Sequence, residues 1–144
     1  MGIVKEGYFK YVVTDSKGNE HITSLALPGK IVGDYLSTTQ KIPCMTSIVA
    51  ATNVEALVCN CDILNKVFNE DRELHQLFSD SLFHNCYTEY LNTHRLSPKE
   101  RYIALLKRCP DILQNISIKE IASFLNVTPT YLSRIRKEIT FENK

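Results

Sequence analysis

Residues 117–138, SIKEIASFLNVTPTYLSRIRKE, carry the strongest local folding signals in this 144-residue sequence. Ser117 is a good helix N-cap, and Glu120 three positions later completes a capping box, so we expect a helix to begin at residue 118. The apolar residues of that helix recur at the spacing of one helical face: Ile121, Ala122, Phe124 and Leu125. Asn126 follows, and because asparagine tolerates the left-handed conformation found at helix ends, we expect the helix to stop there.

A second helix is predicted directly after this stop. Thr128 is its expected N-cap and Pro129 its first residue, where the missing N–H is harmless and the fixed φ is already helical. Its apolar side would consist of Tyr131, Leu132 and Ile135. Its outward face would then be polar and basic, made of Thr130, Ser133, Arg134 and Lys137. Two helices joined by so tight a turn form a helix-turn-helix.

The outward face of this second helix suits DNA chemically. An arginine such as Arg134 can make a bidentate contact to guanine, while hydroxyls and a lysine hold bases or phosphates. The alternative is a pair of packed helices whose basic side faces water. The charge distribution favours DNA, because residues 95–144 hold 10 Lys and Arg against 5 Asp and Glu, whereas residues 1–94 hold 7 against 11. The whole chain has a net charge of only +1, and its excess of basic residues lies in the C-terminal part. That part would be attracted to the phosphates of DNA.

The first sixty residues show the alternation of β structure. Residues 7–15 and 20–27 form two alternating runs around the turn Ser16-Lys17-Gly18-Asn19, which predicts a hairpin. Residues 47–52 and 54–61 supply two further strands of period two. Short, closely spaced strands of this kind are typical of a barrel or jelly roll.

From about Asp62 the periodicity becomes helical, with a short piece ending near Phe68 and a long run from Glu70 to His94. The long run carries an apolar stripe at spacings of three and four: Leu74, Leu77, Phe78, Leu82, Cys86 and Tyr90. Such a stripe can pack against its own barrel and against a second copy of itself. Alternatively, the helix is buried wholly against its own domain.

A second capping box, from Ser97 to Glu100, begins the next helix, with Pro98 at its first position, and this helix is expected to end at Cys109. We therefore place a domain boundary near Arg95. The expected fold class is α+β: a partial β-barrel or jelly roll at residues 1–68, a long connecting helix at 69–95 and a helical helix-turn-helix domain at 96–144.

Several classes of protein are disfavoured. The sequence has no run of about eighteen apolar residues and no signal-peptide layout, which indicates a cytoplasmic protein without a membrane partner. No CxxC pair occurs among the five cysteines Cys44, Cys59, Cys61, Cys86 and Cys109, so neither a metal nor another cofactor is expected. Without a GxSxG, P-loop or HExxH motif the chain is not expected to be an enzyme, and Asp34 is expected to be a turn or capping residue.

These elements together resemble the Crp/Fnr family of bacterial transcription regulators. IVKEGYFKYVVTDSKGNEHITSLALPGKIVGD is similar to the hairpin and glycine-bounded segment that lead into the phosphate-binding cassette of a cyclic-nucleotide-binding domain. IASFLNVTPTYLSRIRK resembles the DNA-binding half in the version common in Bacteroidetes. The family's first sensor strands have no counterpart here, so the barrel would have open edges. Residues 139–144 are too few for the β wing that many relatives carry.

The resemblance implies a homodimeric transcription regulator that binds double-stranded DNA at a near-palindromic operator, with RNA polymerase as a further partner. A recognition helix at 128–139 would place Thr128, Pro129, Thr130, Ser133, Arg134 and Lys137 near bases or phosphates. The long helix would be the dimer helix, with Leu74, Leu77, Phe78 and Leu82 at the seam. A two-fold dimer would set its recognition helices about 34 Å apart. The alternative is a degenerate sensor-like module that binds a protein partner and does not read DNA sequence.

The resemblance also implies a small-molecule effector pocket at Gly33, Asp34, Cys44 and Met45. Cyclic-nucleotide binders have Gly-Glu and, about ten residues on, an arginine followed by Ser or Thr, which hold the ribose and the phosphate. Gly33-Asp34 approximates the first element, but Cys44-Met45 stands where the arginine pair belongs, and Lys41 is the nearby cation. Because a buried phosphate without a charged partner is costly, we expect a regulator that does not depend on cyclic AMP and whose effector is unknown.

Overall fold

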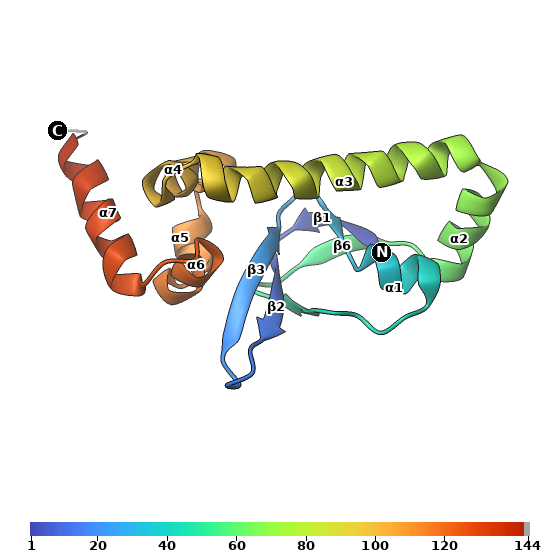
Figure 1. The fold of residues 1–144 in the computed structure, drawn as a ribbon, viewed down its shortest axis with the longest axis horizontal. Helices are drawn as coiled ribbons and strands as arrows, with labels where there is room; N and C mark the ends of the chain where they lie inside the picture. Colours follow the sequence, from blue (N-terminus) through green and yellow to red (C-terminus); the bar gives the residue numbers. More distant parts are fainter. Residues whose placement is uncertain (143–144) are drawn as a thin grey trace.

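The computed structural model describes residues 1–142, and these contain six strands and seven helices in an α+β arrangement. Figure 1 shows one long helix, α3 (Arg72–Arg95), running along the molecule with the strands beneath its middle. The helices that precede α3 lie at one of its ends and those that follow it lie at the other. The predicted α+β fold class is confirmed.

The strands form two small antiparallel sheets. One has β1 (Gly2–Glu6) between β4 (Ile31–Val32) and β6 (Glu55–Val58), and the other has β2 (Phe9–Thr14) between β3 (Glu20–Ala26) and β5 (Ser47–Ala50). Apolar side chains from both sheets meet in one small cluster: Val4, Ala26, Val32, Phe9, Tyr11, Ile48 and Ala56. The predicted hairpin is β2–β3, which pairs along both strands with one bulge.

The turn of the hairpin follows from its residue types. The Asp15 carboxylate accepts hydrogen bonds from the backbone N–H groups of Lys17 and Asn19 at 2.8 and 2.9 Å. Gly18 has a φ of 84°, a left-handed conformation that glycine adopts without steric cost. The turn predicted at residues 16–19 is therefore confirmed.

The helices begin and end close to the residues predicted from the sequence periodicity and the capping motifs. The two predicted helical runs are α2 (Cys61–Glu70) and α3, and both predicted capping boxes are formed, at the start of α4 (Pro98–Arg108) and of α6 (Ile118–Phe124). The second helix of the predicted pair is α7 (Pro129–Glu142), which continues past its expected end at residue 139. Two short helices, α1 (Tyr35–Gln40) and α5 (Ile112–Asn115), complete the set in the described residues.

The main hydrophobic core joins the hairpin sheet to the C-terminal helices. Residues 8–27 contribute five buried side chains: Tyr8, Val12, Ile22, Leu25 and Leu27. The C-terminal helices and the residues that cap them contribute the others: Tyr102, Leu105, Cys109, Ile112, Ile116, Ile121, Ala122, Leu125, Leu132 and Ile135. The helices after residue 96 therefore share their core with the hairpin. The division of the chain at residues 68 and 95 remains a prediction.

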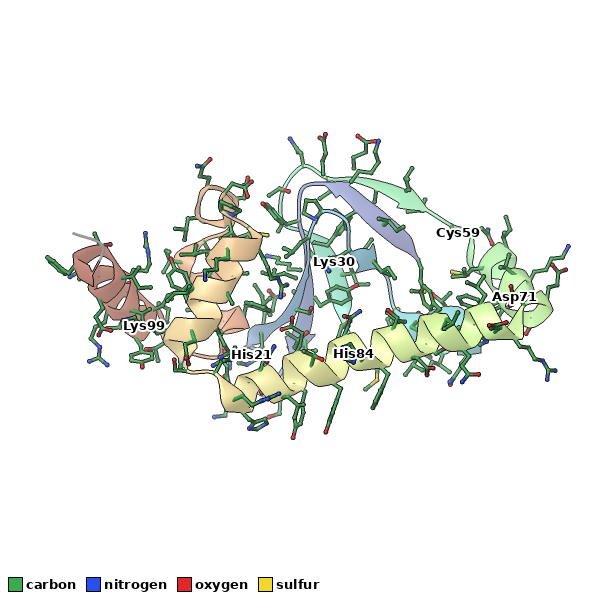
Figure 2. All side chains as sticks on the ribbon, turned by 90° about the horizontal axis from the view of Figure 1, so that it is seen from above. His21, Lys30, Cys59, Asp71, His84 and Lys99 are labelled. Atoms are coloured by element: carbon green, nitrogen blue, oxygen red, sulfur yellow. The ribbon has the colours of Figure 1, made fainter. Side chains whose placement is uncertain are left out.

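α3 is more exposed than a helix packed into its own domain. None of its side chains is buried, so the alternative of a helix covered wholly by its own domain is wrong. Phe78 and Leu82 of the predicted stripe are half-buried, whereas Leu74, Leu77 and Tyr90 are 43%, 62% and 59% exposed. Residues four apart turn about 40° around a helix of 3.6 residues per turn, so the stripe winds around α3 and only part of it is covered. Figure 2 shows α3 along the edge of the molecule, with side chains projecting away from the strands.

The outer face of the β4-β1-β6 sheet is also apolar and exposed. Ile3 lies in register with Ile31 on one side and with Leu57 on the other, and these side chains are 50%, 36% and 63% exposed. An uncovered apolar row of this kind is unusual on a sheet face. That strands of the family's sensor domain lack a counterpart here remains a prediction.

Candidate nucleic-acid interface

The turn between α6 and α7 is built by local hydrogen bonds. Asn126 adopts a φ of 53°, the left-handed conformation predicted for it, and its N–H donates to the Ser123 carbonyl at 2.9 Å. The Val127 N–H then donates to the Ala122 carbonyl, also at 2.9 Å. Thr128 caps α7, because its Oγ1 accepts a hydrogen bond from the Tyr131 N–H at 3.2 Å. The chain thus changes direction within four residues and sets α7 against α6.

Buried apolar side chains hold the two helices together. Ile121 and Leu132 are 0% exposed, and Leu125 and Ile135 are 2% exposed. Because Leu132 and Ile135 take the inner side of α7, the opposite side must face solvent. The six residues predicted to contact DNA are all exposed: Thr128, Pro129, Thr130, Ser133, Arg134 and Lys137. That they contact DNA remains a prediction.

Tyr131 differs from its predicted place. The sequence pattern predicts that it lies on the apolar inner side of α7, but it is 37% exposed. The guanidinium carbon of Arg134 lies 5.1 Å from the centre of its ring. Residues three apart are neighbours on a helix surface, so the spacing of an aromatic residue and an arginine was the signal for this contact.

α6 is fixed to the hairpin by polar contacts as well as by the core. The Lys10 ammonium donates to the Glu120 carboxylate at 2.5 Å, and the Ile22 N–H donates to the Ser123 hydroxyl at 3.0 Å. The Lys10 hydrogen bond, together with that of Ser117, holds the pKa of the Glu120 carboxyl below its usual value, so Glu120 stays ionised at neutral pH. The hydroxyl of Tyr8 donates to Asp111 just before α5. The face of α6 that meets the hairpin is therefore not available to DNA.

The predicted effector residues only partly come together. Asp34 caps α1, accepting a hydrogen bond from the Ser37 N–H at 2.7 Å, as expected for a capping residue. Gly33 is held beside it, with its N–H donating to the Tyr11 hydroxyl at 3.0 Å. The Cys44 thiol donates to the Ser37 hydroxyl at 3.1 Å, whereas Met45 is 80% exposed. Lys41, the nearby cation, lies 3.2 Å from the carboxylate of Asp62.

Two cavities lie elsewhere on the molecule. One, of about 560 Å³, is at the corner of α1, α2 and α3 and is lined by Tyr35, Phe68, Asn69, Arg72, His75, Gln76 and Ser79. The other, of about 430 Å³, lies where the residues before β2 approach α5. Neither cavity is lined by Gly33, Asp34, Cys44 or Met45. The assignment of those four residues to an effector pocket remains a prediction.

The cysteines and acidic residues form no evident metal centre. Across residues 1–142, no three His, Cys, Asp or Glu side chains are grouped so that they could hold a metal ion. Cys44, Cys59, Cys61 and Cys86 are exposed free thiols, and Cys109 is buried in the main core, where burial raises the pKa of its thiol. Within the same residues, no helix is both long enough and apolar enough to cross a bilayer.

This chain resembles known proteins in its fold. No family model and no curated protein matches the sequence. Solved structures of the same fold include FixK2 from Bradyrhizobium japonicum, at 19% identity and a TM-score of 0.75, with 99% of this chain and 75% of FixK2 covered. A regulatory protein from Silicibacter pomeroyi DSS-3, assigned as cAMP-binding, gives 20% identity and a TM-score of 0.70, with 96% of this chain and 66% of that protein covered.

A protein from Eubacterium rectale, assigned to the Crp/Fnr family of transcriptional regulators, is also similar in structure. It gives 13% identity and a TM-score of 0.67, with 98% of this chain and 69% of that protein covered. The chain therefore spans between 66% and 75% of the length of these three proteins. The likeness shows the fold alone: two small antiparallel sheets, a long helix and a C-terminal helix-turn-helix, arranged as in these three proteins.

Proposed function

We propose that this protein is a DNA-binding transcription regulator of the Crp/Fnr type, which binds a near-palindromic operator as a homodimer through α7. The observation that carries the proposal is the outward face of α7. It presents Arg134, Lys137 and hydroxyl groups to solvent on the second helix of a helix-turn-helix whose first helix is anchored behind it. The fold shared with known regulators supports the same function.

The chemistry of this face explains how it would act. The N-terminal residues of a recognition helix enter the major groove, where a guanidinium pairs with guanine and hydroxyls meet bases or phosphates. Thr130, Ser133 and Arg134 lie in the first two turns of α7, which is the part that reaches the base edges. Lys137 lies one turn further along and would contact the phosphate backbone.

Binding to DNA selected from a random pool, followed by fluorescence anisotropy over a salt series, tests the function. We expect selective binding whose affinity falls as salt rises, because phosphate contacts release counterions. Arg134→Ala should cost about 1–3 kcal/mol for each half-site, which is the usual worth of one bidentate base contact. Lys66→Ala removes the same charge from exposed α2, at the other end of the molecule from α7, and should leave the affinity unchanged. Equal affinity for selected and random DNA at every salt concentration would favour the degenerate interaction module.

The dimer part of the proposal rests on the exposed side of α3. Phe83, Tyr87 and Tyr90 are 70%, 50% and 59% exposed, and their spacing of four and three residues is that of a coiled-coil seam. The rings of Phe83 and Tyr87 stack at 5.7 Å, and those of Tyr87 and Tyr90 at 6.5 Å. Of the four seam residues predicted from the sequence, Leu74 and Leu77 are also exposed, whereas Phe78 lies against Phe68 with ring centres 5.2 Å apart.

Sedimentation equilibrium of single variants tests which part of α3 pairs. Tyr87→Glu should convert a dimer into a monomer, because it would place a charge in an apolar seam. Thr88→Glu adds the same charge about 100° further round the helix and should leave the dimer intact. Leu77→Glu tests the seam predicted from the sequence in the same way. A wild-type monomer at all concentrations would contradict the dimer.

Independence from cyclic AMP is the remaining part of the proposal. Cys44 and Met45 offer no cation at the position where the family's arginine holds phosphate, and Lys41 is already paired with Asp62. We therefore expect that cyclic AMP neither releases heat on titration at micromolar concentrations nor changes operator affinity. A measured dissociation constant in the micromolar range would refute this expectation.

A further inference from the structure

The Arg134 guanidinium lies over the ring of Tyr131 on the exposed side of α7. The guanidinium carbon lies 5.1 Å from the ring centre, within the distance at which a cation is attracted to an aromatic face. Within residues 1–142, the Arg134 guanidinium contacts the Tyr131 ring and forms no ion pair or hydrogen bond. About two thirds of the Tyr131 side chain is covered, since 37% is exposed, so the ring is partly fixed in place.

Contact with the Tyr131 ring still leaves N–H groups of Arg134 free to bind a base. A guanidinium carries five N–H donors in one planar group, so contact with a single ring leaves donors available to a base. Bidentate recognition of guanine uses two of those N–H groups, pointing at O6 and N7. An arginine already held in one plane loses less conformational freedom when it binds than a freely rotating one.

We infer that Tyr131 is a positioning residue that holds Arg134 ready to read a guanine, and so sets how strongly this protein discriminates between base pairs. The inference rests on the proposed function and adds to it a specificity role for a residue outside the predicted DNA contacts. An exposed cation–π contact has an energy that corresponds to about two- to fivefold in an equilibrium constant. Loss of the stack should therefore lower discrimination by about that factor for each half-site.

The test compares two replacements of Tyr131 on the full chain. Tyr131→Leu keeps an apolar side chain but removes the ring, and Tyr131→Phe keeps the ring but removes the hydroxyl. The readout is the ratio of affinities for the selected DNA and for the same duplex with each G·C pair replaced in turn. We expect Tyr131→Leu to lower this ratio about two- to fivefold per half-site at one G·C position, and Tyr131→Phe to retain the wild-type ratio. Melting followed by circular dichroism confirms that both variants are folded.

A double-mutant cycle separates positioning from a direct contact. In an Arg134→Ala background, Tyr131→Leu should leave the ratio unchanged, because the ring would have nothing to position. The same loss with and without Arg134 would overturn the inference, and so would a Tyr131→Phe variant as impaired as Tyr131→Leu, which would assign the role to the hydroxyl.

A measurement without DNA keeps this inference separate from the proposed function. In the free protein, the ring current of Tyr131 should shift the side-chain proton resonances of Arg134 upfield relative to Tyr131→Leu, and Tyr131→Phe should retain the shift. No difference between wild type and Tyr131→Leu would overturn the stack whatever the DNA results. A wild-type protein that shows the shift but no preference for any DNA would instead refute the proposed function.

Discussion

Glu120 takes part in two sets of contacts, which makes it a sensitive point for testing how the helix-turn-helix is held. One carboxylate oxygen accepts from the N–H and hydroxyl of Ser117 at 3.1 and 2.7 Å, completing the capping box of α6. The other oxygen pairs with the Lys10 ammonium of β2 at 2.5 Å. The two side chains are only 32% and 21% exposed, so water screens their charges less than it would on an open surface.

Replacing Glu120 with glutamine removes the charge and leaves the capping box possible, since glutamine serves there as well as glutamate. The variant loses a charge-assisted hydrogen bond and leaves the half-buried Lys10 ammonium without its anion. A hydrogen bond to a charged group contributes about 1.5–3 kcal/mol, so Glu120→Gln should lower the free energy of unfolding by about that amount. Urea denaturation followed by circular dichroism measures the loss.

The chain contains a matched control at the start of α4. Glu100 forms the same capping box with Ser97, and the structure gives it no lysine partner from the hairpin. Glu100→Gln should therefore cost less than Glu120→Gln. Equal losses in the two variants would refute the reasoning, as would additive effects of Glu120→Gln and Lys10→Met in a double-mutant cycle.

The same contact gives stability a defined dependence on pH. Lys10 and Ser117 hold the pKa of Glu120 below its usual value, so the folded protein binds this proton less readily than the unfolded chain does. The stabilisation is then fully present above the unfolded pKa, about 4.3, and is lost as the pH falls through the folded pKa. The difference in stability between wild type and Glu120→Gln should be constant from about pH 6 to 8 and shrink below about pH 4.

Three further changes test other parts of the fold by urea denaturation. Leu132→Ala should cost about 2–5 kcal/mol, because this fully buried side chain joins α7 to α6, and a smaller loss would mean that the site collapses around the gap. Asn126→Ala should lower the free energy of unfolding by about 1–2 kcal/mol, because alanine is strained at the φ of 53° found there, whereas Asn126→Gly should cost much less. Similar losses in the two variants would argue against a conformational cause. Asp34→Ala should lower the free energy of unfolding by about 0.5–2 kcal/mol, because it removes the cap of α1. An unchanged stability would contradict this prediction.

Elements fixed by contacts within a few residues could be predicted from the sequence. Both capping boxes bring together groups three positions apart, and Asn126 ends its helix through its own backbone conformation. The hairpin turn likewise depends on Asp15 and Gly18, which act on the residues beside them. Residue type therefore decided these features before any tertiary contact was considered.

Features that depend on distant partners were not predictable in this way. Lys10 and Glu120 are 110 positions apart, and nothing in either local pattern indicates the other. Periodicity predicts that α3 has apolar residues, but their tertiary partners decide which of them are covered, as Phe68 of α2 does for Phe78. Tyr131 was misplaced for a related reason, because an aromatic residue can cover a core with one part and support a neighbour with another.

The arrangement of these contacts links the β part to the proposed DNA-reading face. α7 is held through α6, and α6 is held to the hairpin by the Lys10–Glu120 pair, by the hydrogen bond between Ile22 and Ser123 and by the shared core. In a two-fold dimer that reads an operator, the spacing of the two α7 helices depends on how rigidly each is joined to its own α3 and sheets. The hairpin and the residues that flank it make this connection, so in the proposed regulator a signal arriving at the β part would reach α7 through them.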